Sequence, residues 1–232
     1  MSSPSIRALR RYRPAALLLA LAVSLAVLAG AQPDAWDFRL IAQRAESLYG
    51  PLGEGRARID AWQRLLEESG GLPEGEQLQA VNRFFNAQLR FTDDISLWGD
   101  VDYWATPVEA LLKGAGDCED FAIAKYISLR HLGVPAQKLR ITYVKALRLN
   151  QAHMVLTYYP RPDAVPLVLD NLIGSLLPAS QRTDLQPVYA FNGEGLWLAN
   201  ASGGKQVGDS KRLSRWQDLL KKMKAQGFPL NE

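Results

Sequence analysis

The chain has 232 residues, of which 47% are hydrophobic and 22% are charged, and these proportions are typical of a soluble globular protein with a sizeable buried core. Its formal net charge of +3 arises at the extreme N-terminus, where four of the 27 basic residues lie and none of the 24 acids. Without those four the net charge is −1, which excludes nucleic-acid binding through a general excess of basic side chains.

The first 31 residues have the pattern of a secretory signal peptide. Arginines up to Arg13 precede an apolar run from Ala15 to Leu28, and Ala29-Gly30-Ala31 follows it. This order of a basic stretch, an apolar stretch and small residues is typical of a cleaved leader. Because the run is shorter than the roughly 18 residues of a membrane-spanning helix, we expect cleavage after Ala31. The expected mature domain, 32–232, is then exported without stable membrane insertion; the alternative is an uncleaved anchor.

The first part of the expected mature chain has the periodicity of packed helices. Apolar residues recur at spacings of three and four in the segments 37–49, 57–69 and 76–89, which is the pattern of amphipathic helices. Gly50-Pro51 and the stretch 70–73 separate the three segments. We interpret these helices as packing elements.

The next stretch, 91–113, is rich in aromatic and acidic residues and predicts a loop that ends in a short helix. Thr106, Pro107 and Glu109 have the order of a capping box with proline in the first turn. Its aromatic residues either pack in the core or line a cleft, and its acids are typical of a solvated loop that could still contribute a metal ligand. These residues are Trp98, Tyr103 and Trp104, and Asp93, Asp94, Asp100 and Asp102.

A further helix is predicted from its cap at Asp117 to about Leu132, and beyond Pro135 the hydrophobic period changes to two. The alternation predicts strands at 138–147, 151–159 and 166–172, a hairpin at 187–199 that turns at Asn192-Gly193, and then a final amphipathic helix with Leu213, Trp216, Leu220 and Met223 on its apolar face. Helices followed by consecutive strands indicate an α+β domain with an antiparallel sheet.

The only cysteine, Cys118, falls in the first turn of the helix that Asp117 caps. The helix N-terminus favours a thiolate, but a nucleophile also needs a base and an orienting group. His131 ends the same helix too far away to serve, whereas His153 lies in a predicted strand and Asp170 ends the next one. If both strands face the helix, they complete a Cys-His-Asp triad. The residues alone leave open a buried structural cysteine and a core histidine.

Three stretches resemble the bacterial transglutaminase-like cysteine proteinases. They are DYWATPVEALLKGAGDCEDFAIAKYISLRHLGVP, AHMVLTYY and LVLDN, and the resemblance is closest to the LapG type and extends over essentially the whole expected mature chain. It implies a transglutaminase-like, papain-like α+β fold in which the nucleophile helix packs on an antiparallel sheet. It also implies that Cys118 is the nucleophile, His153 the base and Asp170 the orienting acid.

The resemblance further implies a calcium site beside the thiol. The metal-binding acids of the family correspond to Asp117 and Glu119, and Asp120 is a third candidate that could instead cap the helix. A physical argument agrees, because three carboxylates would raise the pKa of the thiol of Cys118 unless a cation neutralised them, and Ca²⁺ prefers such oxygen ligands. The alternative is that the acids only complement the positive end of the helix.

The function implied by the resemblance is that of a periplasmic, calcium-dependent cysteine endopeptidase. In this family the substrate is the N-terminal region of a large surface adhesin, whose release promotes biofilm dispersal. The regulator is the periplasmic domain of an inner-membrane cyclic di-GMP receptor, which inhibits the protease. Two other functions remain: a transglutaminase-like acyl transferase that uses the same triad with an amine in place of water, and a non-catalytic binding module, which would be expected to lack a triad member.

Overall fold

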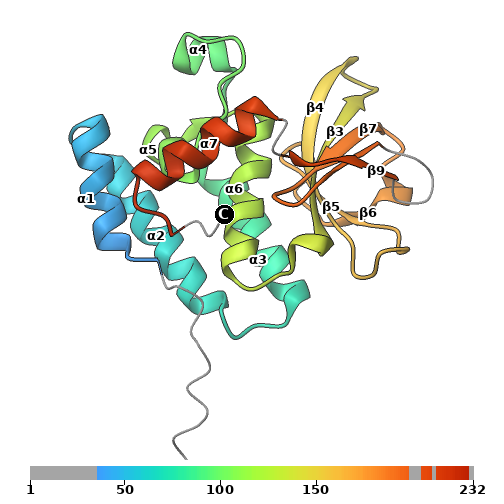
Figure 1. Cartoon of the computed structure of the whole chain (residues 1–232), viewed down its shortest axis with the longest axis horizontal. Helices are drawn as coiled ribbons and strands as arrows, with labels where there is room; N and C mark the ends of the chain where they lie inside the picture. Colours follow the sequence, from blue (N-terminus) through green and yellow to red (C-terminus); the bar gives the residue numbers. More distant parts are fainter. Residues whose placement is uncertain (1–35, 199–204, 211–212, 230–232) are drawn as a thin grey trace, which may run out of the picture. The chain divides into compact units, whose positions relative to one another are not determined.

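Helices fill the first half of the described chain and antiparallel strands most of the second half (Figure 1). The computed structural model describes residues 36–198, 205–210 and 213–229, so the predicted leader at 1–31 lies outside the described residues. The helices are α1 (Phe38–Tyr49), α2 (Glu54–Ser69), α3 (Glu74–Gln88), α4 (Asp94–Trp98), α5 (Pro107–Lys113), α6 (Cys118–His131) and α7 (Ser214–Ala225). Among these elements, none combines the length and the apolar character that crossing a bilayer requires.

Most strands belong to one antiparallel sheet in the order β6-β5-β4-β3-β7-β8-β9. The strands are β1 (Arg90–Phe91), β2 (Ala115–Gly116), β3 (Leu139–Ala146), β4 (Gln151–Tyr158), β5 (Leu167–Leu169), β6 (Leu177–Pro178), β7 (Leu185–Phe191), β8 (Leu196–Leu198) and β9 (Lys205–Gly208). The predicted α+β architecture is therefore confirmed. One addition is the parallel pair β1–β2, in which Arg90 lies opposite Ala115; it joins the end of α3 to the residues just before α6.

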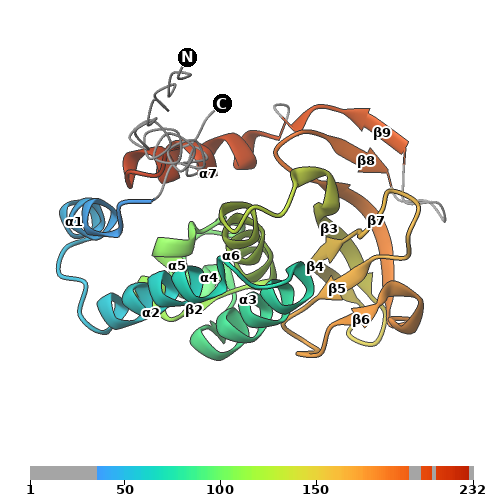
Figure 2. The same ribbon diagram turned by 90° about the horizontal axis from the view of Figure 1, so that it is seen from below.

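Helix α6 is the central element of the unit that begins at Trp36 (Figure 2). It packs against α3 and α5 on one side and against β4 and β3 on the other. All residues from Asp120 to Leu129 are buried, as expected for a helix that is covered on every side. The Trp62 indole of α2 donates to Ser128 Oγ at 2.8 Å, which gives both buried polar groups a partner.

The segment predicted as a loop at 91–113 contains one more helix than expected. Asp93 accepts a hydrogen bond from the Ser96 backbone at 3.0 Å and so begins the short helix α4, which ends at Gly99 in a left-handed conformation. The capping box predicted for α5 is present: the Glu109 N–H donates to Thr106 Oγ1 at 3.1 Å and the Thr106 N–H donates to Glu109 Oε2 at 2.7 Å. Helix α4, by contrast, has only five residues, and its N-terminal cap is the side chain of Asp93.

Candidate active site

The start of α6 is held in place by a buried carboxylate. Asp120 accepts one hydrogen bond from the Asp117 N–H at 3.3 Å and another from the Ala105 N–H at 2.7 Å. Asp120 therefore caps the helix, and because a carboxylate offers about four lone-pair sites, these two bonds still leave it able to bind a metal ion. Gly116 leaves room for this carboxylate, because a Cβ atom there would lie 2.7 Å from Asp120 Oδ2. Together these contacts fix Cys118 as the first residue of α6.

His153 and Asp170 meet across the neighbouring strands β4 and β5, which pair through Leu156 and Leu169. The His153 Nε2 atom lies 2.8 Å from Asp170 Oδ1, and both side chains are buried. This bond leaves Nδ1 as the imidazole nitrogen that can exchange a proton with another group. The two residues are 17 positions apart in the chain. From the sequence, their meeting depended on whether both strands face the helix, and the structure brings them together.

Asp170 is stabilised as a carboxylate. Burial acts to raise its pKa, but hydrogen bonds from His153, the Leu172 N–H and Arg182 outweigh burial and lower the pKa to about 2. The Arg182 NH2 group donates to Asp170 Oδ2 at 2.7 Å. A second cation lies nearby, because Asp170 partly offsets the burial that lowers the pKa of the fully buried Lys125 to about 7. Neither Arg182 nor Lys125 was predicted from the sequence.

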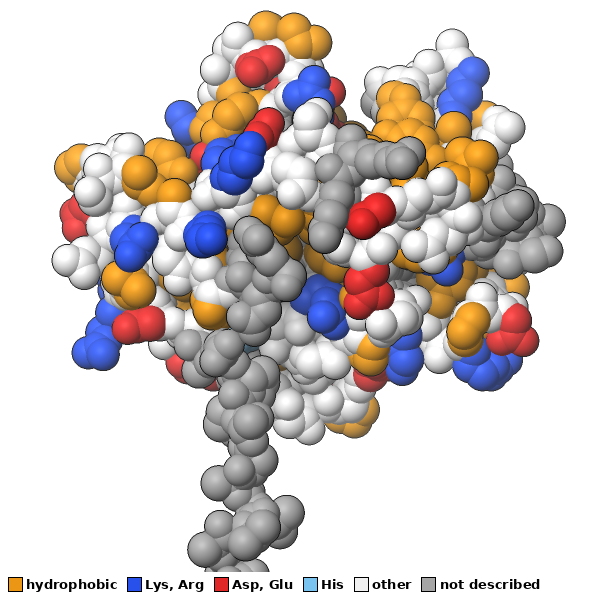
Figure 3. All heavy atoms as spheres, in the orientation of Figure 1, with side chains coloured by type: hydrophobic (Ala, Val, Ile, Leu, Met, Phe, Trp, Pro, Cys, Tyr) orange, Lys and Arg blue, Asp and Glu red, His pale blue; other side chains and the backbone are white. Residues whose placement is uncertain are grey.

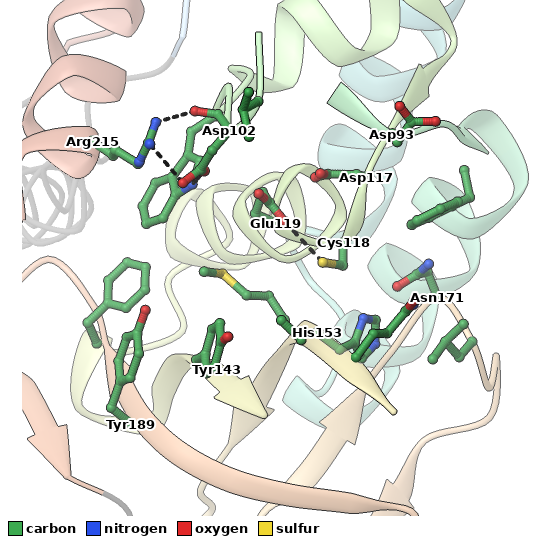
Figure 4. Close-up of a pocket in the computed structure, with 18 of the residues that line it drawn as sticks. Asp93, Asp102, Asp117, Cys118, Glu119, Tyr143, His153, Asn171, Tyr189 and Arg215 are labelled. Atoms are coloured by element: carbon green, nitrogen blue, oxygen red, sulfur yellow. Dashed lines mark hydrogen bonds and ion pairs between the residues drawn. The ribbon is translucent and has the colours of Figure 1, made fainter. Parts of the chain in front are cut away.

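Cys118 and His153 line one pocket of about 940 Å³ (Figure 4). The backbone N–H of Met154, the residue after His153, lies close enough to the Cys118 sulfur to favour its thiolate. The sulfur itself donates to Glu119 Oε2 at 3.0 Å. Burial and the Glu119 carboxylate raise the pKa of the Cys118 thiol, so this arrangement favours the neutral thiol.

Acidic side chains gather at the start of α6 more densely than the sequence predicted. Carboxylate oxygens lie within 4.8 Å of one another in two sets that extend beyond the predicted residues: Asp94, Asp117 and Asp120, and Asp94, Asp102 and Glu119. The segment before α5 therefore contributes Asp94, from α4, and Asp102 to the cluster. The sequence left open that one of the four acids of this segment is a metal ligand, but it did not distinguish Asp94 and Asp102 from Asp93 and Asp100.

The cluster is electrostatically unfavourable without a cation. Burial, with neighbouring carboxylates, raises the pKa of Asp94 to about 6 and raises the pKa values of Asp117 and Asp120 as well. Asp94 Oδ1 and Asp117 Oδ1 are buried and lack a hydrogen-bond partner among the described residues. Unpaired buried oxygens of this kind are the hard ligands that Ca²⁺ prefers, so the donor set fits a divalent cation.

The aromatic residues of the same segment serve both purposes that the sequence left open. Trp104 packs on Phe191, with ring centroids 5.4 Å apart, and also lines the pocket. Trp98 stacks on Tyr103 at 4.5 Å. His131, which the sequence excluded from catalysis, stacks on Trp36 at the far end of α6.

Comparisons with known proteins point to one family. The family model described as bacterial transglutaminase-like cysteine proteinase matches residues 71–188. The solved structure of Legionella pneumophila LapG has a TM-score of 0.68 and 46% identity and covers 79% of this chain and 97% of that chain. The EGTA-treated form gives 0.69 and 46% over the same shares, and the calcium-bound form gives 0.67 and 45% with 79% and 98% covered. No curated protein matches the chain.

Proposed function

The chain belongs to the bacterial transglutaminase-like cysteine proteinases of the LapG type, and from this membership we propose that it is a periplasmic, calcium-dependent cysteine endopeptidase. The observation that carries the proposal is the buried His153–Asp170 pair, whose side chains lie 2.8 Å apart. Cys118, the first residue of α6, lines the same pocket as His153. We propose that these three residues are the catalytic triad.

The proposed chemistry begins with proton transfer from the Cys118 thiol to His153 Nδ1. Asp170 accepts from Nε2 of the same ring, so it fixes the tautomer and stabilises the imidazolium that forms. The sulfur then attacks the scissile carbonyl carbon, and the resulting oxyanion is stabilised by backbone N–H groups of the first turn of α6, which have no acceptor within the helix.

The remaining steps of the proposed reaction release the amine product and then hydrolyse the thioester. His153 gives its proton to the leaving amine, the C–N bond breaks, and an acyl group remains on Cys118. Water then attacks the acyl carbon while His153 takes a proton from it, and the C–S bond breaks to regenerate the thiol and release a carboxylic acid.

We further propose that the acids at the start of α6 hold Ca²⁺. Asp117, Glu119 and Asp120 are the proposed ligands, and Asp94 and Asp102 lie close enough to add oxygens. A bound cation would neutralise the carboxylates that oppose the thiolate. The related Legionella protein is known in a calcium-bound form, which supports the choice of metal.

For the substrate we propose the N-terminal region of a large surface adhesin, whose cleavage releases the adhesin and promotes biofilm dispersal. The pocket suits an extended polypeptide, because its lining includes two apolar side chains that are at least half exposed: Val101, which follows α4, and Leu149, between β3 and β4. Hydrophobic side chains, drawn in orange, are exposed over α4 and over the upper end of the β3–β4 region in the view of Figure 1 (Figure 3). We also propose that the periplasmic domain of an inner-membrane cyclic di-GMP receptor inhibits the enzyme by binding it.

The alternative, acyl transfer to an amine, uses the same triad and the same thioester. The deciding experiment is to form the acyl-enzyme on Cys118 with a peptide substrate and to compare its release by water with its release by a lysine analogue. Release by water at a rate that the analogue leaves unchanged supports the proteinase. Accumulation of the amide product at the expense of the acid would make the protein a transferase.

A further inference from the structure

We propose that Arg182 is a positioning residue of the catalytic triad, which fixes the carboxylate of Asp170 and through it the imidazole of His153. The inference rests on the proposed function, because it assigns a role to Arg182 within the same triad. It adds a fourth residue, 12 positions after Asp170 in the chain, that the triad pattern does not contain.

The contacts of Asp170 divide between its two oxygens. Oδ1 lies 2.8 Å from His153 Nε2 and accepts from the Leu172 N–H at 3.1 Å. Oδ2 accepts from Arg182 NH2 at 2.7 Å. Because rotation of the carboxylate would break the Oδ2 bond, the guanidinium holds Oδ1 toward the imidazole. A charge-assisted bond of this kind is about twice as strong as one between neutral groups.

Arg182 is itself fixed by a second carboxylate. Its Nε donates to Asp184 Oδ1 at 3.0 Å and its NH2 donates to Asp184 Oδ2 at 2.9 Å. The backbone directs it there through the turn after β6, where the Arg182 N–H donates to the Ala179 oxygen at 3.1 Å. With only 2% of its surface exposed, the guanidinium has little freedom to leave Asp170.

The charges of the group suit the triad. Two carboxylates, Asp170 and Asp184, share the single guanidinium of Arg182, so Arg182 alone does not neutralise the pair and Asp170 can still offset an imidazolium on His153. A salt bridge that only stabilised the fold would not need a histidine on the other oxygen of its carboxylate, whereas Asp170 contacts His153 through Oδ1 and Arg182 through Oδ2. Lys125, from α6, is the other cation that acts on Asp170, but its ammonium has no hydrogen-bond partner among the described residues and so cannot orient the carboxylate.

The test compares the intact wild-type chain with Arg182→Gln, which removes the cation but keeps an amide in its place. The matched control is Arg161→Gln, which removes the same charge from an exposed pair with Asp163. A second variant, Asp184→Asn, keeps Arg182 and weakens its anchor. Two readouts are made in calcium-containing buffer: kcat and KM for peptide cleavage, and the Nε2–H resonance of His153 in ¹⁵N-histidine-labelled protein. The second readout needs no substrate, and the chain has only two histidines.

We expect Arg182→Gln to lower kcat by about 10²-fold with little change in KM, since misplacement of a catalytic group has an effect of this size. We also expect its His153 Nε2–H resonance to exchange with water faster than in the wild type, Asp184→Asn to show a smaller change in the same direction, and Arg161→Gln to show none. A folded Arg182→Gln with wild-type kcat and an unchanged His153 resonance would overturn the proposal. If Arg182→Gln does not fold, wild-type behaviour of Asp184→Asn overturns it instead. If the wild type cleaves no peptide, the proposed function fails, and the resonance still decides whether Arg182 positions His153.

Discussion

Contacts from four different groups converge on Asp170. Its side chain accepts from an imidazole, a guanidinium and a backbone N–H, and its carbonyl oxygen accepts from the Asn86 amide at 2.8 Å. Charged hydrogen bonds in a buried setting make the ionised form much more stable in the folded protein than in the unfolded chain. The folded-state pKa of about 2 therefore has a consequence for stability.

The low pKa of Asp170 makes the unfolding free energy depend on pH. Because the folded pKa lies below the unfolded value of about 3.9, ionised Asp170 adds stability on the order of 2 to 3 kcal/mol above roughly pH 5, and this contribution is lost as the pH falls toward 2. We expect the difference in unfolding free energy between wild type and Asp170→Asn to shrink between about pH 5 and pH 2.5. Urea unfolding at several pH values measures it. A difference that stays constant over this range would show that Asp170 has an ordinary pKa when folded.

The sequence predicted site residues from a short motif at the helix start and from their order along the chain, as for His153 and Asp170, but it gave no indication of Arg182. Asp117, Cys118, Glu119 and Asp120 are contiguous at a predicted helix start, where a thiol among carboxylates indicates a functional site. Arg182 gave no such indication, since an arginine in a turn most often lies in solvent and only the β6–β7 connection brings it under Asp170.

The elements around the start of α6 converge on the acidic cluster, and they predict how calcium acts. A cation that binds only the folded state stabilises it by mass action, by about 2.7 kcal/mol at a hundredfold excess over Kd. For a chain of this size we expect a rise in Tm of about 5 to 10 °C, reversal by chelator, and a weaker effect of Mg²⁺, which requires a more regular set of ligands. Differential scanning calorimetry measures the shift.

Variants in the cluster separate the cation from other effects. Asp117→Ala and Glu119→Ala should each weaken calcium binding by isothermal titration calorimetry, whereas Asp218→Ala, an exposed acid of α7, should leave it unchanged. If the wild type binds no calcium, or if Glu119→Ala binds it as tightly as the wild type, the acids only complement the helix end.

Helix α7 contacts both α5 and the segment that precedes it through Lys222. Lys222 lies 3.1 Å from Glu109 Oε2 and donates to the Trp104 carbonyl at 2.7 Å. Glu109 is 2% exposed, so removal of its cation leaves a buried carboxylate without a counter-charge.

We therefore expect Lys222→Met to lower the unfolding free energy by about 1 to 3 kcal/mol. The adjacent Lys221→Met removes an equal charge from an exposed pair with Asp218 and should change it by less than about 0.5 kcal/mol. Urea denaturation of both variants is the measurement. Equal effects of the two substitutions would mean that the contact with Glu109 contributes nothing.

Longer elements were predictable because their hydrophobic period extends over several turns or strand residues. The three first helices, α6, β3 and β4 all lie within a few residues of their predicted ranges. The elements that were not predicted are short: α4 has five residues and depends on one cap at Asp93, β1, β2 and β6 have two residues each, and β9 has four. These strands are too short to show a hydrophobic period, and they form where the fold brings them beside a partner strand.

At the scale of the whole molecule, the predicted export determines where the enzyme would meet its substrate. The basic stretch and the apolar run before Ala31 predict that the mature protein begins at or near Gln32 and is recovered from the periplasm. Intact-mass spectrometry of protein from the native host measures the N-terminus, and fractionation measures the location. A full-length chain in the membrane fraction would indicate a retained anchor.

We propose that Cys118, supported by His153 and Asp170, cleaves a polypeptide when calcium is bound. The most direct measurement is to incubate the purified enzyme with the N-terminal region of the host's largest secreted repeat protein, in calcium and in excess EGTA, and to follow the fragments by mass spectrometry. We expect one defined cleavage by the wild type in calcium, none in EGTA, recovery when calcium is restored, and none by Cys118→Ala or His153→Ala in either buffer. Cleavage by Cys118→Ala at the wild-type rate would show that Cys118 is not the nucleophile.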